Sequence, residues 1–470
     1  MVTQLHSSQS LRNRLAEFRL IPRVETCPKV VSFAQTSLGR ITMLATFGLG
    51  LCYFVPNPFI AMFFTSILAF MTFMPEYRHF ILAVTPIAIV ILQSFKEPLL
   101  LGLNLAVMAL GIVLYWCTRR WPESRFGQRP VAFLLTGFTA LIVFACAATP
   151  RSLSYSILWD LVGFMTSYIW FIAYALIDRS SKPARDLTLE LATFHPLWGS
   201  STVPFPKGAA YLRRIEAQDP ERLAIVQLKG LKLLAWAILL AVFQNLWYGF
   251  FHGYLRIPMP DQALAMSVRG TPVAWHLRWE CQILAFFELI LGFSVMGHRF
   301  ISFCRMAGFN ALRSTYRPLS ATTIIEFFNR FYYYFKELLV DFFFYPTFLR
   351  YWKGHRRLRT VFATFAAVLV GDSFFHLTRD WQFIQRDGLW HAIMGYQASF
   401  VYNAALATGL SVSQLRKRGH RPTGFFRGRL LPTFGVCLFY TLVIVFGSEG
   451  RQFSVVQTLK YLASLFFIRW

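Results

Sequence analysis

The side chains best suited to chemistry in this sequence are polar groups set into apolar, aromatic-rich stretches. The stretch 320–346 carries, among its apolar residues, Glu326, Asn329, Arg330, Lys336, Glu337 and Asp341. Two histidines follow, His376 near the end of an apolar run and His391 at the start of another. Asp372 and Asp380 flank the first of them. A neutral imidazole can take a proton from a hydroxyl near neutral pH, and ionisable groups at membrane depth are functional-site candidates. These residues therefore predict a site for acid–base chemistry.

The spacing of the charged residues in this stretch indicates which of them interact. Glu326 and Arg330 are four residues apart with the acid first, which suits an ion pair on one face of a helix. Glu337 and Asp341 are also four apart, so their like charges repel unless Lys336 or a basic residue elsewhere joins them. Two interpretations remain, a solvated interfacial face and a buried polar network lining a cavity. Each histidine is likewise either an interfacial helix-end residue or a catalytic base.

The elements that must position these residues are membrane-spanning helices. Of the 470 residues 56% are hydrophobic, 50 are Phe, and the mean hydropathy is +0.46. Apolar stretches of spanning length, about 20 residues each, are expected at 40–56, 58–75, 79–95, 99–117, 130–149, 153–177, 226–250, 277–297, 360–377, 389–411, 429–447 and 453–469. The sequence therefore predicts an all-α polytopic membrane protein with about 11–12 transmembrane helices.

Positive charge is concentrated in alternate connections between these stretches. The formal net charge is +25. Lys and Arg are frequent at the N-terminus and in the connections 119–129, 178–225, 299–317, 350–359 and 416–429. This is the positive-inside pattern of membrane proteins, not the single basic surface of a nucleic-acid-binding domain, so no nucleic-acid partner is expected. With the basic connections in the cytoplasm, the N-terminus also lies there. The segment 320–346 is then expected to enter and leave on the cytoplasmic side, as a re-entrant or interfacial segment.

The same division predicts the organisation of the chain. A cytoplasmic basic N-terminus is expected at 1–37 and a single membrane domain at 38–470. The latter is expected to comprise N-terminal helices at 38–177, a cytoplasmic loop at 178–225 with an amphipathic helix over 213–222, and a core at 226–470. The seven cysteines are scattered without a CxxC pair, which predicts neither a disulfide framework nor a zinc site. No bound cofactor is indicated.

The chain from about residue 200 to 470 resembles the membrane-bound O-acyltransferases, particularly the bacterial branch that acetylates alginate or transfers D-alanine to teichoic acid. That branch carries a stretch of the form GF…NF.RP…A.SI.EFWRRWH…SLS..LRDY.Y.PL. In register with it are Gly308, Phe309, Arg317, Pro318, Ala321, Glu326, Phe327, Arg330, Asp341 and Pro346. The segments ending in His376 and His391 follow the order of the family's GLWHG and second GL[YW]HG motifs. Tyr332 stands where the family has the histidine of WRRWH.

This resemblance implies a fold and an activity. It implies a membrane-bound O-acyltransferase bundle that moves an acyl group, such as acetyl, from a cytoplasmic thioester to a hydroxyl of an envelope or secreted glycan or lipid. The donor would be acyl-coenzyme A or an acyl-carrier thioester. His376 would be the general base and Tyr332 the second catalytic residue. Supporting roles fall to Asn329, Arg330, Asp341, Asp372, Asp380 and His391, and substrate binding to Lys336 and Glu326.

The surroundings of the protein are also implied by the resemblance. It predicts a multi-pass protein of the bacterial inner membrane, with membrane lipids around it and a periplasmic or carrier-protein partner. Two alternatives to an active transferase remain open. Tyr332 in place of a histidine would suit a catalytically inactive relative, and a charged re-entrant segment would suit a transporter or flippase.

Overall fold

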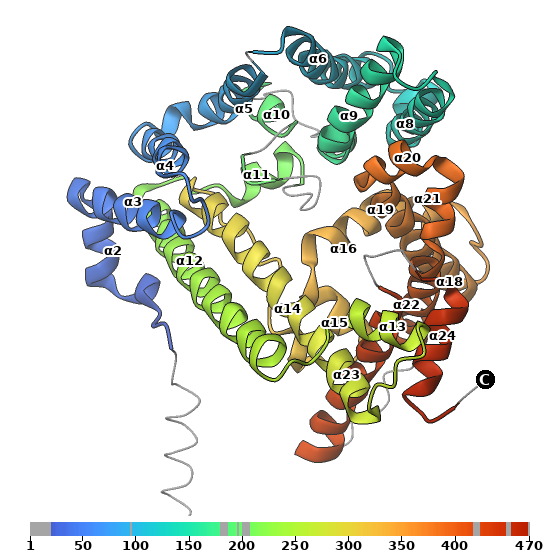
Figure 1. Cartoon of the computed structure of the whole chain (residues 1–470). Helices are drawn as coiled ribbons and strands as arrows, with labels where there is room; N and C mark the ends of the chain where they lie inside the picture. Colours follow the sequence, from blue (N-terminus) through green and yellow to red (C-terminus); the bar gives the residue numbers. More distant parts are fainter. Residues whose placement is uncertain are drawn as a thin grey trace, which may run out of the picture.

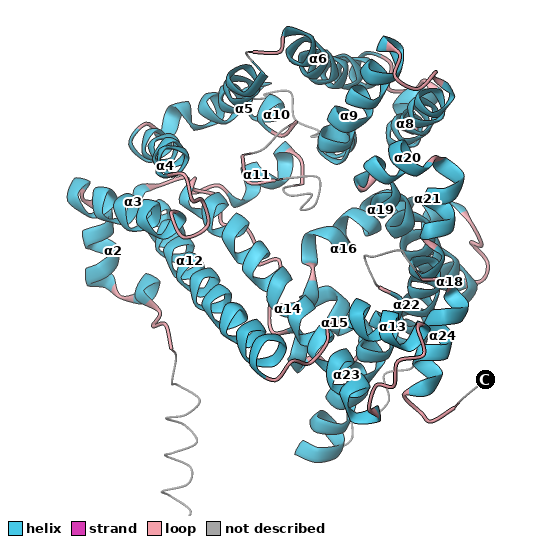
Figure 2. Cartoon of the chain, in the orientation of Figure 1, coloured by secondary structure: helices cyan, strands magenta, loops and turns pink. Residues whose placement is uncertain are grey.

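The structure, a computed structural model, describes residues 20–94, 96–178, 187–194, 197–199, 207–416, 424–447 and 453–468. Within these ranges the chain forms helices and no β-strand (Figure 2). The first part of the expected N-terminal segment, 1–19, lies outside the described residues, and so do 179–186, 195–196 and 200–206 of the expected loop at 178–225.

Eight helical segments of the described chain are long and apolar enough to cross a membrane: Pro75–Leu92, Pro98–Arg120, Pro130–Ala147, Leu153–Ile177, Pro220–Tyr254, Trp275–Met306, Arg356–Arg379 and Phe426–Phe446. They contain α5 (Arg78–Ser94), α6 (Pro98–Arg120), α8 (Pro130–Ala147), α9 (Leu153–Ile177), α12 (Pro220–Tyr248), α14 (Trp275–Met306), α18 (Arg356–Phe365), α19 (Ser373–Arg379) and α23 (Leu431–Val443). Two shorter apolar helices, α3 (Ser37–Leu51) and α4 (Pro58–Phe73), precede them. The chain is an all-α polytopic membrane protein.

The remaining helices connect or cover these segments. They are α2 (Pro28–Gln35), α7 (Arg125–Gln128), α10 (Leu187–Ala192), α11 (Ala209–Ile215), α13 (Pro260–Val268), α15 (Ile324–Phe331), α16 (Tyr333–Leu339), α17 (Tyr345–Arg350), α20 (Trp381–Asp387), α21 (Leu389–Gly395), α22 (Gln397–Leu415) and α24 (Val455–Ser464). Turns of π-helix occur at η3 (Gly249–Tyr254), η5 (Val340–Phe344), η6 (Ala366–Asp372) and η7 (Phe426–Leu430).

Two of the expected spans differ from the structure. The stretch expected to span at 389–411 is divided at Tyr396, whose backbone (φ −86°, ψ 5°) separates α21 from α22. The stretch at 453–469 forms α24, a helix of 10 residues. It packs with α13 and α14 through Leu264, Cys281 and Tyr461, so part of its apolar surface is buried against protein.

The helix expected over 213–222 in the 178–225 loop has different bounds. Helix α11 ends at Ile215, and α12 begins at Pro220 with Asp219 accepting a hydrogen bond from the Arg222 amide at 2.7 Å. An N-cap carboxylate followed by proline starts a new helix, and apolar periodicity does not reveal that break. Within the expected N-terminal segment, α2 packs on α12 through Val31 and Ala34.

The segment around 320–346 occupies the middle of the molecule. In Figure 1, α15 and α16 lie between α14 on one side and α19 and α22 on the other. The segment is a succession of short helices, α15, α16, η5 and α17, and not one span. Its buried residues include Phe327, Tyr334, Phe335 and Leu338. Protein therefore covers the broken helix, which is the condition for interrupted backbone at membrane depth.

Ion pairs hold several of these segments to one another. Arg78 pairs with Glu216 at 2.8 Å, Arg119 with Glu190 at 3.1 Å, and Lys232 with Glu25. Each pair links segments that are far apart in the sequence.

Candidate active site

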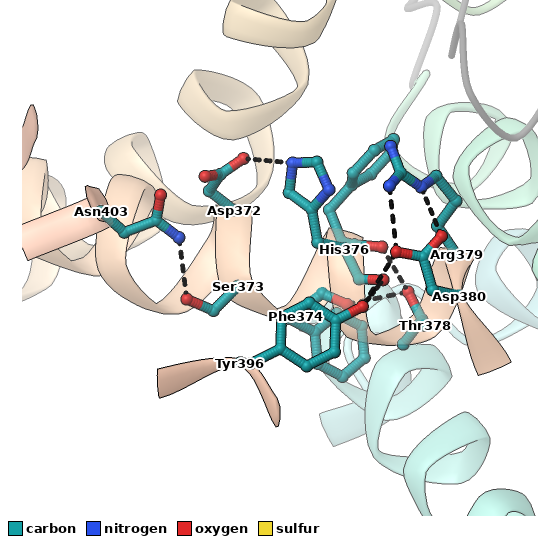
Figure 3. A network of polar contacts seen from close by, with 10 residues as sticks. Asp372, Ser373, Phe374, His376, Thr378, Arg379, Asp380, Tyr396 and Asn403 are labelled. Atoms are coloured by element: carbon teal, nitrogen blue, oxygen red, sulfur yellow. Dashed lines mark hydrogen bonds and ion pairs between the residues drawn. The ribbon is translucent and has the colours of Figure 1, made fainter. Parts of the chain in front are cut away.

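His376 and Asp372 lie one helical turn apart on the continuous segment formed by α18, η6 and α19. His376 Nε2 is 3.4 Å from Asp372 Oδ1 (Figure 3). The carboxylate is 8% exposed and the imidazole 36% exposed. A separation of 3.4 Å is long for a hydrogen bond, but such contacts often tighten when a substrate binds. The pair is therefore placed to hold a proton on Nε2 and to leave Nδ1 as the basic nitrogen.

The backbone at the end of α19 is fixed by a second polar cluster. The Tyr396 hydroxyl lies 2.9 Å from the His376 carbonyl oxygen and 2.9 Å from Asp380 Oδ2, and it donates to one of them at a time. Arg379 holds the Asp380 carboxylate with two hydrogen bonds, of 2.7 and 2.9 Å. Figure 3 shows both groups beside His376. Asp380 thus acts on the helix end and not on the imidazole ring.

A cavity of about 790 Å³ lies against this pair. Helices α12, α13, α14, α15, α16, α19, α22, α23 and α24 contribute to its wall. The wall includes His376, Asp372 and Tyr332 from the residues expected at the site, and also Arg379. Asn403 adds an amide whose Nδ2 donates to Ser373 Oγ at 2.9 Å. The structure therefore gathers three of the expected residues around one space.

Tyr332 occupies the junction between α15 and α16, where its backbone (φ −144°, ψ 75°) leaves the helical region. Its ring stacks on Phe335 at 5.4 Å and packs on Phe293 at 4.8 Å between centroids. Phe335 in turn lies 6.3 Å from the His376 ring, so one aromatic side chain touches both residues. Burial raises the pKa of the Tyr332 phenol. Tyr332 therefore remains neutral and can donate a hydrogen bond from its hydroxyl.

The expected pair between Glu326 and Arg330 is confirmed, with 2.6 Å between the guanidinium and the carboxylate. Arg330 also donates to Ser320 Oγ at 2.6 Å, and Glu326 accepts from the Thr322 amide at 2.7 Å. These contacts close the turn that leads into α15. Neither charged residue lines the cavity.

The expected repulsion between Glu337 and Asp341 is relieved by a cation from another part of the chain. Lys207, just before α11, pairs with Glu337 and lies 3.1 Å from Asp341. Lys336 pairs with Glu337 and covers the Tyr333 ring at 4.7 Å. Burial opposes ionisation of Glu337, but hydrogen bonds from the two lysines outweigh it and lower the pKa of that carboxyl. Burial raises the pKa of Asp341, and Lys207 offsets this in part. These charges form a half-buried network outside the cavity.

Two further expected residues lie away from this centre. Asn329 and His391 are both exposed, and neither lines the cavity. Asn329 is on α15 and His391 on α21. The structure therefore separates them from His376.

Sequence reasoning missed a second imidazole–carboxylate pair, of which the carboxylate lines the same cavity. His252 Nε2 lies 2.7 Å from Glu288 Oε1, and Glu288 lines the cavity. One residue in the sequence could have indicated this pair. Glu288 is an acidic residue within the apolar stretch expected to span at 277–297. Its partner is 36 positions away in the chain, so spacing did not reveal the pair.

The described residues contain no group of three or more His, Cys, Asp and Glu side chains placed to hold a metal ion. In the comparisons with known proteins, no family model matched the chain and no curated protein matched it.

Proposed function

We propose that the protein is a membrane-bound O-acyltransferase with His376 as its general base. The observation that carries this is the His376–Asp372 pair at 3.4 Å in the wall of a cavity of about 790 Å³ inside a polytopic helical protein. The register of residues 308–346 with the family's motif supports the same assignment.

In the proposed reaction an acceptor hydroxyl attacks the carbonyl carbon of a thioester. Nδ1 of His376 takes the hydroxyl proton as the new C–O bond forms, and Asp372 stabilises the imidazolium that results. The C–S bond then breaks, and the proton passes from His376 to the departing thiolate. The neutral Tyr332 hydroxyl is suited to donate a hydrogen bond to the oxyanion of the intermediate.

The donor, the partners and the location belong to the same proposal. A coenzyme A or acyl-carrier thioester would enter from the side of the basic connections, whose cations suit a phosphate-bearing group. The acceptor would be a hydroxyl of an envelope or secreted glycan or lipid, and a periplasmic or carrier protein would assist. We place the protein in a bacterial inner membrane with its N-terminus in the cytoplasm, on the charge pattern of its connections.

The test is acyl transfer by purified protein in liposomes, with radiolabelled acetyl-coenzyme A or palmitoyl-coenzyme A and a cell-envelope extract as acceptor. His376→Ala should lower the rate by about 10²–10⁴-fold, because a positioned base contributes about that much. His391→Ala is the matched control, since it removes an exposed histidine, and it should leave the rate unchanged.

Three outcomes would count against the proposal. Full transfer by His376→Ala would remove that residue from the reaction. A wild-type protein that transfers no label from either donor would be an inactive relative. Movement of labelled lipid across the bilayer without a new ester bond would indicate a transporter.

A further inference from the structure

A cluster of cationic side chains lies where the end of α14 meets α12 and the loop that follows α14. Gly230 of α12 packs closely on Arg305 of α14, since a Cβ added to Gly230 would lie 3.2 Å from Arg305 Cβ. Lys229 precedes this contact point on α12. The Arg305 guanidinium reaches the loop, where Nε and Nη2 donate to the Ala311 carbonyl oxygen at 3.0 and 2.7 Å. Arg313 follows in the same loop, and the like charges of the three cations act on one another.

The Arg305 guanidinium is nearly buried and has no carboxylate partner among the residues that the structure describes. The residue is 8% exposed, and both of its hydrogen bonds go to a backbone carbonyl. The remaining nitrogen, Nη1, makes no hydrogen bond to the described chain and is not fully enclosed. A buried charge without a counter-charge is strongly unfavourable. The carbonyl groups at the C-terminal end of α14 offset only part of it.

Within the described chain, one carboxylate acts on this cluster, and a lysine already holds it. Glu25, in η1 (Val24–Thr26), pairs with Lys232, one turn further along α12. The charge of Glu25 also acts on Lys229 and Arg313. Four cations therefore share a single carboxylate, and the cluster has an excess of positive charge. Guanidinium groups bind phosphate through paired N–H donors, and lysine adds a point charge. The cluster is thus suited to a phosphate group.

The position of the cluster favours a lipid as the source of the phosphate. Helices α12 and α14 both belong to membrane-spanning segments, and Arg305 lies in the last turn of α14. A spanning helix leaves the hydrocarbon core at such an end and reaches the lipid headgroups. The loop that carries Arg313 also exposes apolar side chains, namely Leu312, Tyr316 and Leu319. Neither arginine lines the cavity of the candidate active site, and Lys229 does not line it either. The cluster is therefore separate from the proposed reaction centre.

We propose that Lys229, Arg305 and Arg313 bind the phosphate of an anionic phospholipid headgroup. Nη1 of Arg305 donates to a phosphate oxygen, and the half-buried side chains of Lys229 and Arg313 supply the neighbouring charges. The exposed Leu312 and Tyr316 lie against the upper part of the acyl chains. The binding does not require acyl transfer, so it stands apart from the proposed function.

A lipid at this position would contact the loop that fixes the junction between α15 and α16. The Tyr316 amide donates to the Arg330 carbonyl oxygen at 2.8 Å, and the Tyr333 amide donates to the Ser314 carbonyl oxygen at 2.8 Å. The loop is thus bonded to residues on both sides of Tyr332. This links the lipid site to the element that brings Tyr332 into the cavity wall.

The test measures lipid binding to the purified full-length protein in an uncharged detergent, by native mass spectrometry. Dioleoylphosphatidylglycerol is the anionic probe. Dioleoylphosphatidylcholine has the same acyl chains without net charge, and coenzyme A is a soluble source of phosphate. We expect phosphatidylglycerol to bind at least about tenfold more tightly than phosphatidylcholine, which corresponds to 1.4 kcal/mol. An excess of coenzyme A should leave phosphatidylglycerol bound.

The Arg305→Gln variant should weaken binding of phosphatidylglycerol by about tenfold, because it removes a charged hydrogen-bond donor. Arg222→Gln is the matched control, because Arg222 is an exposed cation on α12 that pairs with Asp219, and its affinity should stay within about twofold of the wild type. If Arg305→Gln fails to fold, Arg313→Gln removes a half-buried cation from the loop and must weaken binding severalfold. In the wild type, amide hydrogen exchange over 310–317 should fall severalfold when phosphatidylglycerol replaces phosphatidylcholine.

Equal affinities of Arg305→Gln and Arg222→Gln for phosphatidylglycerol would overturn the proposal, as would equal affinities of the wild type for the two lipids. Displacement of phosphatidylglycerol by coenzyme A would assign the cluster to a soluble phosphate and overturn the lipid assignment. Unchanged hydrogen exchange over 310–317 would also count against it. These outcomes are distinct from failure of the proposed function, which is decided by the rate of acyl transfer in His376→Ala.

Discussion

At the scale of single residues, the proposed reaction depends on how Asp372 and His376 face each other. The carboxylate is nearly buried, and the imidazole is open to the cavity at 36% exposure. The π-helical turn η6 ends at Asp372, directly before α19 begins. Such turns are frequent at functional sites because they re-aim side chains without breaking the helix. The orientation of the imidazole therefore depends on a local change in helix geometry.

Replacement of Asp372 tests whether it positions the base. Asp372→Asn should lower kcat by about 10–100-fold with KM little changed, because the imidazolium formed in the transition state loses its carboxylate. Asp372→Glu should recover part of the rate. The measurement is steady-state acyl transfer in liposomes. If Asp372→Asn raised KM and left kcat unchanged, Asp372 would have a role other than support of the base. Equal rates for Asp372→Asn and Asp372→Glu would lead to the same conclusion.

At the scale of elements, the central segment is held in place by a side chain from a distant connection. Lys207 pairs with Glu337 on α16 and with Asp341 on η5, at 3.1 Å for the latter. Tyr211 on α11 reinforces the contact, since its hydroxyl is 3.0 Å from that of Tyr334. The segment that carries Tyr332 and Phe335 into the cavity wall is thus anchored by the region around α11.

The Lys207→Met variant should loosen this anchor. Glu337 and Asp341 would then face each other with Lys336 as the remaining cation, and a buried carboxylate without its partner is destabilising. We expect amide hydrogen exchange in 333–344 to rise by about tenfold, equivalent to 1.4 kcal/mol of local stability. Lys353→Met, in an exposed basic connection, is the control. Exchange that rises equally in both variants would contradict the assigned role of Lys207.

At the scale of the whole molecule, three connections far apart in the sequence meet at one buried arginine. Arg78, 2% exposed, donates to Glu216 Oε1 at 2.8 Å, and His79 lies 2.9 Å from the other carboxylate oxygen. Gly308 (φ +96°) lies against the guanidinium, where an added Cβ would be 2.9 Å from Arg78 Cζ. These contacts join α5, the link before α12 and the loop after α14.

The Glu216→Gln variant should destabilise the protein by about 3 kcal/mol at neutral pH, because it leaves Arg78 buried without its carboxylate. Burial opposes ionisation of Glu216, but His79 and Arg78 outweigh it and hold its pKa below the usual 4.5. A lowered carboxyl pKa gives stability that is complete above pH 4.5 and is lost as the pH falls through the folded-state value. The difference between wild type and variant should therefore shrink below pH 4.5.

Thermal unfolding in nanodiscs at several pH values measures this difference. Glu221→Gln is the matched control, because Glu221 is exposed on the first turn of α12, and it should change stability by less than about 0.5 kcal/mol. A Glu216→Gln effect that persists undiminished well below pH 4.5 would contradict the ion-pair explanation.

The sequence by itself determined the class of the molecule and its local pairs. Apolar stretches long enough to cross a bilayer predicted the all-α membrane fold, because backbone groups in lipid must be satisfied within the helix. The spacing of Glu326 and Arg330 predicted their ion pair, since residues four apart on a helix are neighbours. Asp372 and His376 are also four residues apart and lie 3.4 Å from each other for the same reason. Such contacts depend on helix geometry and need no knowledge of the packing.

The tertiary structure decided which distant residues meet. It placed Lys207 between Glu337 and Asp341 and separated Asn329 and His391 from His376. It also brought His252 to Glu288, which lines the cavity. The expected final span is shortened to α24, part of whose apolar surface is buried against α13 and α14. Hydropathy measures how much apolar surface a segment carries. Whether lipid or another helix covers that surface is settled by the packing of the whole chain.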